Sequence, residues 1–251
     1  MNSPRIGCVQ YLNARPLIHG WAGHVEFDHP AALCWRLARG DVDLALVSSF
    51  EFLRNPIYRL VNGVSLSSDG PVYSVIVAHR EDISKIDEIE LDPAAETSVS
   101  LLRCLFADLG LTPRLVGRST SPRAGRLLIG DQAIEFRQQQ GAEFHYWDLG
   151  EQWKRIVDLP FVYALWLIRP EVGEADAIAD QLRGLRDDNL ANIDELLADE
   201  KKFNHAFCRR YYRENLRFSF GDAEKRGFER FADLCMKLDL APKRDLRFEL
   251  V

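Results

Sequence analysis

Small polar residues stand at four places where a predicted strand gives way to a helix: Asn13, Ser48–Ser49, Thr97–Ser98 and Gly130–Asp131. The start of a helix exposes unpaired N–H groups and the positive end of its dipole, which together can bind an anion without an arginine. In open α/β sheets, ligands bind beyond the carboxyl ends of the strands, where these residues are expected. Ordinary N-capping is the alternative at any one position, and the fourfold recurrence favours a ligand cleft.

A hydroxyl and two aromatic residues extend this set. Ser74 interrupts the apolar run PVYSVIVA, where a buried hydroxyl requires a hydrogen-bond partner, either a ligand or a neighbouring backbone group. Tyr163 and Trp166 in PFVYALW could wall a pocket for an apolar ring, although core packing explains such aromatics equally well. The sequence has no GxSxG motif, Ser/His/Asp ordering or glycine-rich phosphate loop, which argues against nucleophilic catalysis and phosphoryl transfer.

An alternating pattern of strands and helices must position these residues. Strands are expected at Ile6–Tyr11, Val42–Ser48 and Val72–Ala78, near Glu90–Leu91, before Gly130, and in FHYWDLG and PFVYALWLI. Helices are expected between them, including Ala31–Ala38 and Thr97–Leu109, and four more follow Pro170. Ser48 and Glu51 have the spacing of a capping box. The alternation predicts an α/β protein with a largely parallel sheet.

Composition excludes several kinds of partner. The net charge of −6 argues against nucleic acid, and no Lys/Arg block indicates a membrane surface. The longest apolar run is far shorter than the roughly 20 residues of a transmembrane helix, and the start shows no signal-peptide pattern, so a cytoplasmic protein is expected. The five cysteines are scattered and the histidines lack ligand spacing, which predicts reduced core thiols and no metal. The sequence carries no signal for an oligomeric state.

Seven stretches between Ile6 and Trp166 occur in the order typical of the MqnA family, the chorismate dehydratases of the futalosine route to menaquinone: GCVQYLNARPL, GDVDLALVSSFEFL, DGPVYSVIV, ETSVSLL, LLIGDQAI, WDLGEQW and LPFVYALW. The resemblance covers about two-thirds of the chain. It implies a two-lobed, periplasmic-binding-protein-like fold of type II with a ligand in the cleft. It places residues 1–83 and 161–251 in the first lobe and residues 84–160 in the second, with the C-terminal helices completing the first lobe.

The resemblance also implies the reaction. Chorismate loses the proton at C3 and the hydroxyl at C4 to give 3-[(1-carboxyvinyl)oxy]benzoate, and no metal or organic cofactor is required. Asn13 and Ser74 match the family motifs and are expected to position the ring and assist the leaving hydroxyl. The expected substrate-binding residues, which include Thr97 and Ser98 as ligands of a carboxylate, are Ser48, Ser49, Thr97, Ser98, Gly130, Asp131 and Tyr163.

Two candidates remain for the base: Asp131, and the enolpyruvyl carboxylate of the substrate, which we favour because an N-cap role explains Asp131 equally well. The chain departs from the family pattern at Ala95 and Glu96, where a serine and often a basic residue are usual, and at Asp158, where glycine is usual. Two other functions share this fold: the sister enzyme that makes 1,4-dihydroxy-6-naphthoate, and a binding protein that retains a small carboxylate without turnover.

Overall fold

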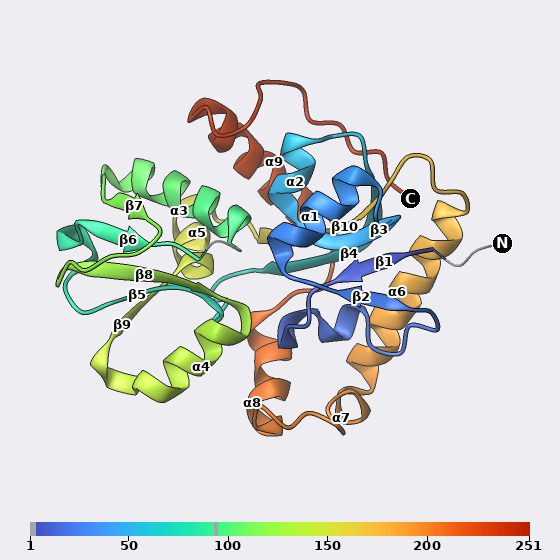
Figure 1. Ribbon diagram of the computed structural model, residues 1–251, viewed down its shortest axis with the longest axis horizontal. Helices are drawn as coiled ribbons and strands as arrows, with labels where there is room; N and C mark the ends of the chain where they lie inside the picture. The colour runs from blue at the N-terminus through green and yellow to red at the C-terminus, as the bar shows by residue number, and fades with distance from the viewer. Residues whose placement is uncertain (1–3, 93–94) are drawn as a thin grey trace.

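The computed structural model describes residues 4–92 and 95–251, and its strands form two five-stranded sheets, one in each lobe (Figure 1). The first sheet has the order β2-β1-β3-β10-β4 and contains β1 (Ile6–Cys8), β2 (Val25–Phe27), β3 (Leu44–Ser48), β4 (Arg59–Ser68) and β10 (Phe161–Ile168). The second has the order β7-β6-β8-β5-β9 and contains β5 (Val75–His79), β6 (Glu88–Glu90), β7 (Arg114–Val116), β8 (Ala124–Ile129) and β9 (His145–Asp148).

Both sheets are mixed, so the expectation of a largely parallel sheet is wrong. Strand β1 pairs in parallel with β2 and β3, whereas β10 runs antiparallel to β3 and β4. In the second sheet β6 is parallel to β7 and β8, and β5 is antiparallel to β8 and β9. The antiparallel strands β5 and β10 are those that carry the chain from one lobe to the other. Strand–helix alternation predicts parallel pairing only where a helix returns the chain to the same sheet.

Strand β4 is absent from the sequence-based prediction. Its Asn62-Gly63 pair resembles a turn, and Gly63 has φ of +80°. In the structure this glycine lies where the pairing of β10 jumps from Ser65 to Leu60, so it marks a bulge and not the end of a strand.

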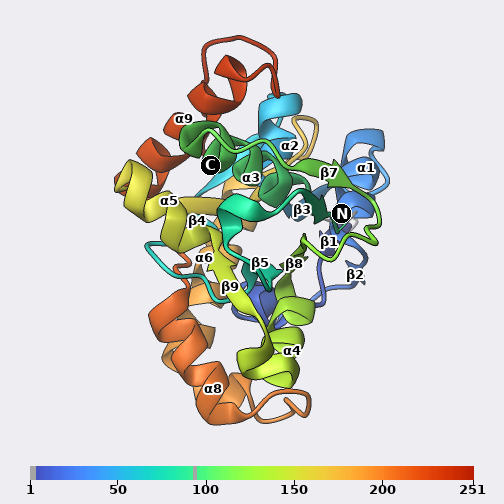
Figure 2. The same ribbon diagram turned by 90° about the vertical axis from the view of Figure 1, so that its left-hand side faces the viewer.

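Helices cover both sheets (Figures 1 and 2). Those of the first lobe are η1 (Leu12–Leu17), α1 (Pro30–Arg39), α2 (Ser49–Arg54), α6 (Ala175–Ala191) and α7 (Ile193–Leu196). The second lobe has η2 (Ile83–Lys85), α3 (Glu96–Leu109), α4 (Gly130–Gln140), η3 (Gly141–Glu143) and α5 (Leu149–Val157). The C-terminal segment adds α8 (His205–Arg210), the π-helical turn η4 (Tyr211–Asn215) and α9 (Asp222–Lys237). As predicted, α3 stops at Gly110, which adopts φ of +66°.

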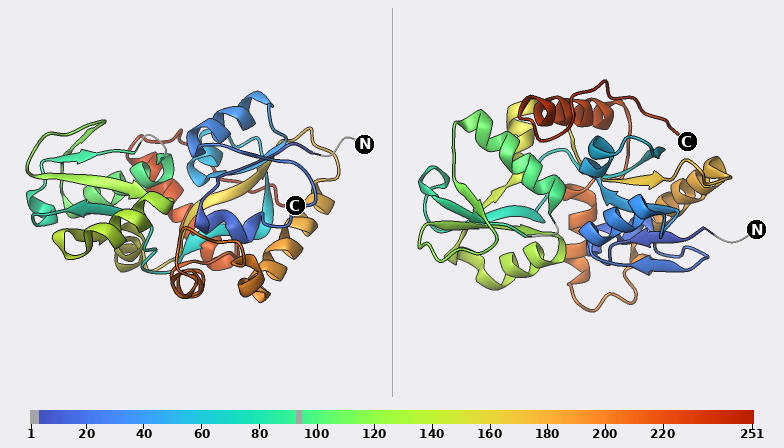
Figure 3. Two further views of the ribbon diagram at one scale, coloured as in Figure 1. Left: turned by 60° about the horizontal axis from the view of Figure 1, so that its bottom comes forward. Right: turned by 45° about the horizontal axis from the view of Figure 1, so that its top comes forward.

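The chain crosses between the lobes at residues 69–74 and again at 158–160. Because β5 pairs within the second sheet, we propose that the second lobe begins near residue 70 and not near 84. The C-terminal segment also contacts both lobes: α6 packs on η1 and β4, and α9 packs on β10 and on α3. Figure 3 shows α8, in orange, at the junction of the lobes.

A continuous hydrophobic core extends through both lobes. All five cysteines are buried free thiols, as the scattered spacing predicts. Among the described residues, no helix combines the length and the hydropathy that a membrane span requires.

Candidate active site

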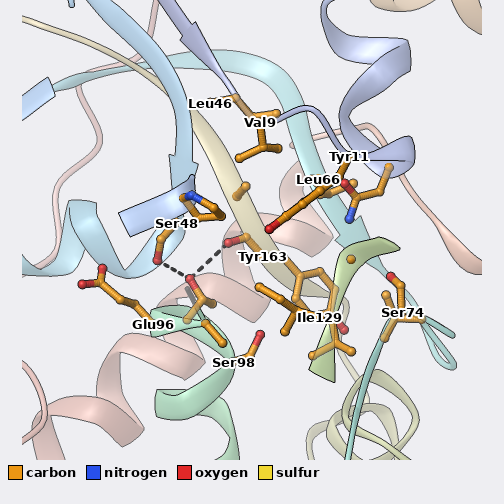
Figure 4. A pocket seen from close by; sticks show the side chains of 18 of the residues that line it. Val9, Tyr11, Leu46, Ser48, Leu66, Ser74, Glu96, Ser98, Ile129 and Tyr163 are labelled. Atoms are coloured by element: carbon orange, nitrogen blue, oxygen red, sulfur yellow. Dashed lines mark hydrogen bonds between the residues drawn. The ribbon is translucent and has the colours of Figure 1, made fainter. Parts of the chain in front are cut away.

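A pocket lies between the two lobes (Figure 4). The first lobe contributes the segment after β1, the end of β3, and parts of β4 and β10. The second lobe contributes the start of β5, the start of α3 and the junction of β8 with α4. Apolar side chains from both lobes, Val9, Leu46, Leu66 and Ile129, face the space in Figure 4. The walls therefore suit an apolar ring, and the strand ends supply the polar groups.

Seven of the nine site residues predicted from the sequence line this pocket: Asn13, Ser48, Ser74, Thr97, Ser98, Gly130 and Tyr163. The other two lie beside it. Ser49 is buried and donates to the Val162 carbonyl at 2.7 Å, which ties α2 to β10. Asp131 accepts from the Leu12 N–H at 2.8 Å and pairs with Lys202 in a neighbouring groove. Burial raises the pKa of Asp131, while the Leu12 N–H and Lys202 oppose the rise.

Among the described residues, none of the N-cap residues at the four helix starts identified in the sequence caps its helix with its own side chain. The capping box predicted for Ser48 and Glu51 is wrong. Ser48 turns its hydroxyl to Thr97 across the cleft, and Glu51 is buried against Arg54, Asn55 and Tyr58. The polar side chains at these positions are therefore available to the pocket or to the opposite lobe.

At one end of the pocket, hydroxyl groups join the two lobes; we call Ser48, Thr97 and Tyr163 the latch. Ser48 and Thr97 bond through their hydroxyls, and Thr97 donates to the Tyr163 carbonyl at 3.2 Å (Figure 4). The Tyr163 hydroxyl lies 3.1 Å from the Ser68 hydroxyl, which donates to the Gly70 carbonyl. The Thr97 hydroxyl proton thus has a protein acceptor, and the latch connects α3 to β3 and β10.

At the other end, Ser74 sits on a strained turn. Its N–H donates to the Val72 carbonyl at 2.8 Å, which closes a γ-turn with Tyr73 at φ of +67°. A non-glycine residue in this region costs about 1–3 kcal/mol and persists only where its surroundings enforce it. The Asp148 carboxylate does so by accepting from the N–H groups of Val72 and Tyr73, at 3.0 and 2.7 Å.

Asp148 supports the Ser74 turn, and the sequence-based prediction omitted it. It is buried, caps α5 through the N–H groups of Gly150 and Glu151, and holds the Ser74 turn at the same time. Asp148 and Glu151 have the spacing of a capping box, which marks the start of a helix, but this signal does not reveal the partner 75 residues away.

Asn13 and Ser74 are close to a third buried group, the Tyr211 hydroxyl. Tyr211 donates to Ser74 Oγ at 2.6 Å. Burial raises the pKa of Tyr211, and hydrogen bonds with Ser74 and Asn13 oppose that rise. Asn13 Oδ1 is buried and lacks a hydrogen-bond partner among the described residues. An orphaned acceptor of this kind is costly unless a ligand satisfies it.

Arg54 neutralises the charge of Glu96, a residue at which the chain departs from the family pattern. Glu96 accepts from Arg54 at 2.9 and 3.3 Å, and the same guanidinium pairs with buried Glu51. Cys34, Glu51 and Glu96 bring three potential metal-ligand atoms within 4.8 Å of one another, and Arg54 supplies the positive charge of this cluster. Among the described lining residues Glu96 is the only carboxylate, and neither histidine, lysine nor arginine is present.

Two α/β lobes with a small-molecule pocket between them define the class of binding-protein-like folds. The chain superposes on the alkanesulfonate-binding protein SsuA of Xanthomonas axonopodis pv. citri with a TM-score of 0.68, at 17% identity over 97% of this chain and 95% of that one. It also superposes on the CA3427 gene product of Candida albicans, described as having the generic periplasmic binding protein fold, with a TM-score of 0.62, at 10% identity over 98% and 92% of the chains.

Within this class, the chain belongs to the menaquinone biosynthesis family, whose model matches residues 4–237. It is 30% identical to the chorismate dehydratase of Thermus thermophilus over 264 aligned positions, covering 94% of this chain and 96% of the relative. The match extends into the C-terminal helices, beyond the seven motifs visible in the sequence.

Proposed function

We propose that this protein is a chorismate dehydratase that converts chorismate to 3-[(1-carboxyvinyl)oxy]benzoate and water. The relative in Thermus thermophilus carries this activity in its name. One observation in this chain carries the proposal: Asn13 Oδ1, which is unpaired among the described residues, and the Ser74 hydroxyl both lie at the same end of an apolar pocket. Following the sequence resemblance, we place the reaction in the futalosine route to menaquinone, in the cytoplasm.

The ring lies between the apolar walls, and its C4 hydroxyl meets Asn13 and Ser74. Ser74 Oγ already accepts the Tyr211 proton, so its own proton is directed to the leaving oxygen. Asn13 Oδ1 accepts the proton of the same C4 hydroxyl. The acceptor on Asn13 orients the C4 hydroxyl, and the Ser74 donor stabilises the negative charge that develops on the oxygen as the C4–O bond breaks.

The base is the enolpyruvyl carboxylate of the substrate. Asp131 stands outside the described lining, and Glu96 is paired with Arg54 on the far side of the pocket from Ser74 (Figure 4). The carboxylate takes the C3 proton, the C3–H electron pair becomes the new ring double bond, and the C4–O bond breaks. The proton passes to the departing hydroxide to give water, and the carboxylate is restored. The stability of the aromatic ring drives the reaction.

The start of α3 holds the second carboxylate of the substrate. Thr97 and Ser98 are at the first turn of this 14-residue helix, whose backbone N–H groups and dipole favour an anion. The Glu96–Arg54 pair reduces the repulsion that a free glutamate at this position would cause.

The test is direct. Purified protein is mixed with chorismate without metal or cofactor, and the products are followed by liquid chromatography and mass spectrometry. The proposal predicts a species lighter than chorismate by one water, with a benzoate-type absorbance. Decay of chorismate at its background rate contradicts dehydration, and slower decay in the presence of the protein indicates a binding protein.

A further inference from the structure

We propose that Tyr211 is a positioning residue for the dehydration, acting through Ser74 as the first member of a hydrogen-bond relay that runs from Tyr211 through Ser74 to the leaving hydroxyl of the substrate. This inference rests on the proposed function and adds a residue from the C-terminal helices, outside the seven motifs of the sequence. Tyr211 is absent from the pocket lining, so its effect on the substrate passes through the lining residues that it bonds, Ser74 and Asn13.

The hydrogen bonds around Ser74 leave a single role for its side chain. Its N–H donates to Val72, and its carbonyl accepts from the Gly130 N–H at 2.8 Å. Its Oγ accepts the phenolic proton of Tyr211 at 2.6 Å. Within the described residues no acceptor is found for the Ser74 hydroxyl proton, so the relay ends in a donor that faces the pocket. Hydrogen bonds in series polarise one another, which makes this terminal donor stronger than an isolated serine.

The fold holds Tyr211 rigidly in this role. Its side chain is fully buried, and its ring stacks on Phe207 at a centroid distance of 5.7 Å and an interplanar angle of 10°. It begins η4, the π-helical turn after α8, and such turns are frequent at functional sites. Tyr73, the strained residue next to Ser74, packs edge-on against the same ring at 6.4 Å. The strained turn and the π-helical turn therefore fix the two ends of one hydrogen bond.

Because Tyr211 is buried, its hydroxyl keeps its proton and remains a hydrogen-bond donor to Ser74. The apolar surroundings raise the pKa of the phenol, so it stays protonated throughout the pH range in which the enzyme works. The relay therefore contributes no ionisation of its own to the pH dependence of turnover.

The test is a double-mutant cycle on the full-length protein with chorismate as substrate. Tyr211→Phe removes the donor and keeps the ring, and we expect kcat to fall about 10-fold with KM nearly unchanged. Ser74→Ala alone should have the larger effect. Adding Tyr211→Phe to Ser74→Ala should cost much less activity than Tyr211→Phe costs alone, because the relay has lost its terminal donor and only the contact of Tyr211 with Asn13 remains.

Tyr212→Phe is the matched control. Tyr212 is the next residue of η4 and is also buried. Its hydroxyl donates to the Leu12 carbonyl at 2.9 Å, so the Tyr212→Phe variant loses a comparable hydrogen bond that lies outside the relay. We expect it to lower thermal stability and leave kcat within about twofold. Equal losses of kcat in Tyr211→Phe and Tyr212→Phe, or additive losses in the cycle, overturn the relay. Absence of turnover in the wild-type protein overturns the proposed function itself, and the two failures are thereby distinguished.

Discussion

The two ends of the pocket are built from the same kinds of residue and differ in where their protons go. At the latch, Thr97 gives its hydroxyl proton to the Tyr163 carbonyl, and Ser48 bonds to Thr97. At the opposite end the bonds stop at Ser74, and Asn13 Oδ1 has no donor among the described residues. At the latch the polar groups bond to one another and hold the lobes together. At the Ser74 end a donor and an acceptor have no protein partner in the described part of the chain, so they can bond to a substrate.

The largest effect is expected at the Ser74 end. Ser74→Ala removes the donor to the leaving hydroxyl, and kcat should fall by about 100- to 1000-fold, as for the loss of an oxyanion donor. Asn13→Ala removes the acceptor that orients the same hydroxyl, and it should also lower kcat. Steady-state kinetics with chorismate as substrate measures kcat for each variant. Ser67→Ala is the control, because Ser67 is equally buried but bonds to the Arg217 carbonyl away from the pocket. A similar loss in Ser67→Ala would show that any buried serine matters, and the comparison would fail.

The latch should affect binding more than chemistry. Thr97→Val removes the hydroxyl that joins Ser48 to Tyr163, and we expect KM to rise about 5- to 10-fold while kcat stays within about threefold. Thr97→Ser keeps the hydroxyl and should restore KM. A fall in kcat as large as that of Ser74→Ala would contradict the division between the two ends.

Asp131 lies beside the pocket and outside its lining, and Asp131→Asn should change little. The amide still accepts from the Leu12 N–H, so kcat should stay within about twofold and its pH profile should be unchanged. A profile that loses its acidic limb in this variant would identify Asp131 as the base and exclude the substrate carboxylate.

The smallest effect concerns a charge pair remote from both ends. Arg5 donates to Asp43 and holds the pKa of that carboxyl below its ordinary value of 3.8. A lowered folded-state pKa stabilises the protein above that value, and the contribution disappears as pH falls through the folded pKa. Asp43→Asn should lower the free energy of unfolding at pH 7 by about 0.5 kcal/mol, because the pair is partly exposed, and should leave activity unchanged.

Urea unfolding at pH 7 and at pH 3 measures this contribution. The difference between wild type and Asp43→Asn should shrink at the lower pH. A difference that stays constant would show that the Asp43 charge makes no contribution.

Local patterns in the sequence predicted what lies within single elements. The polar residues after β1, β3 and β8 and at the start of α3 were found because a strand end and a helix start leave a local signal. Ser74 was found because a hydroxyl is conspicuous in an apolar run. The partners that determine which of these groups are free were not predictable, because Thr97 meets Ser48 across the cleft, 49 residues away, and Tyr211 meets Ser74 over 137 residues.

The fold shows the same limit. The order of strands and helices was largely predicted, whereas the pairing directions of β5 and β10 were not, because they depend on which lobe each strand joins. The departure at Asp158 is explained by the structure: this residue ends α5 with φ of +57°, a conformation in which glycine carries no penalty. It affects the turn before β10 and lies away from the pocket.

The most direct measurement compares chorismate binding to Ser74→Ala and to the double variant Ser74→Ala/Thr97→Val by titration calorimetry, since neither variant turns over enough substrate to disturb the titration. We expect Ser74→Ala to bind chorismate with a dissociation constant close to the wild-type KM, and the added Thr97→Val change to weaken binding about 5- to 10-fold. Loss of binding in Ser74→Ala itself, with no further loss on changing Thr97, would contradict the assignment of chemistry to one end of the pocket and closure to the other.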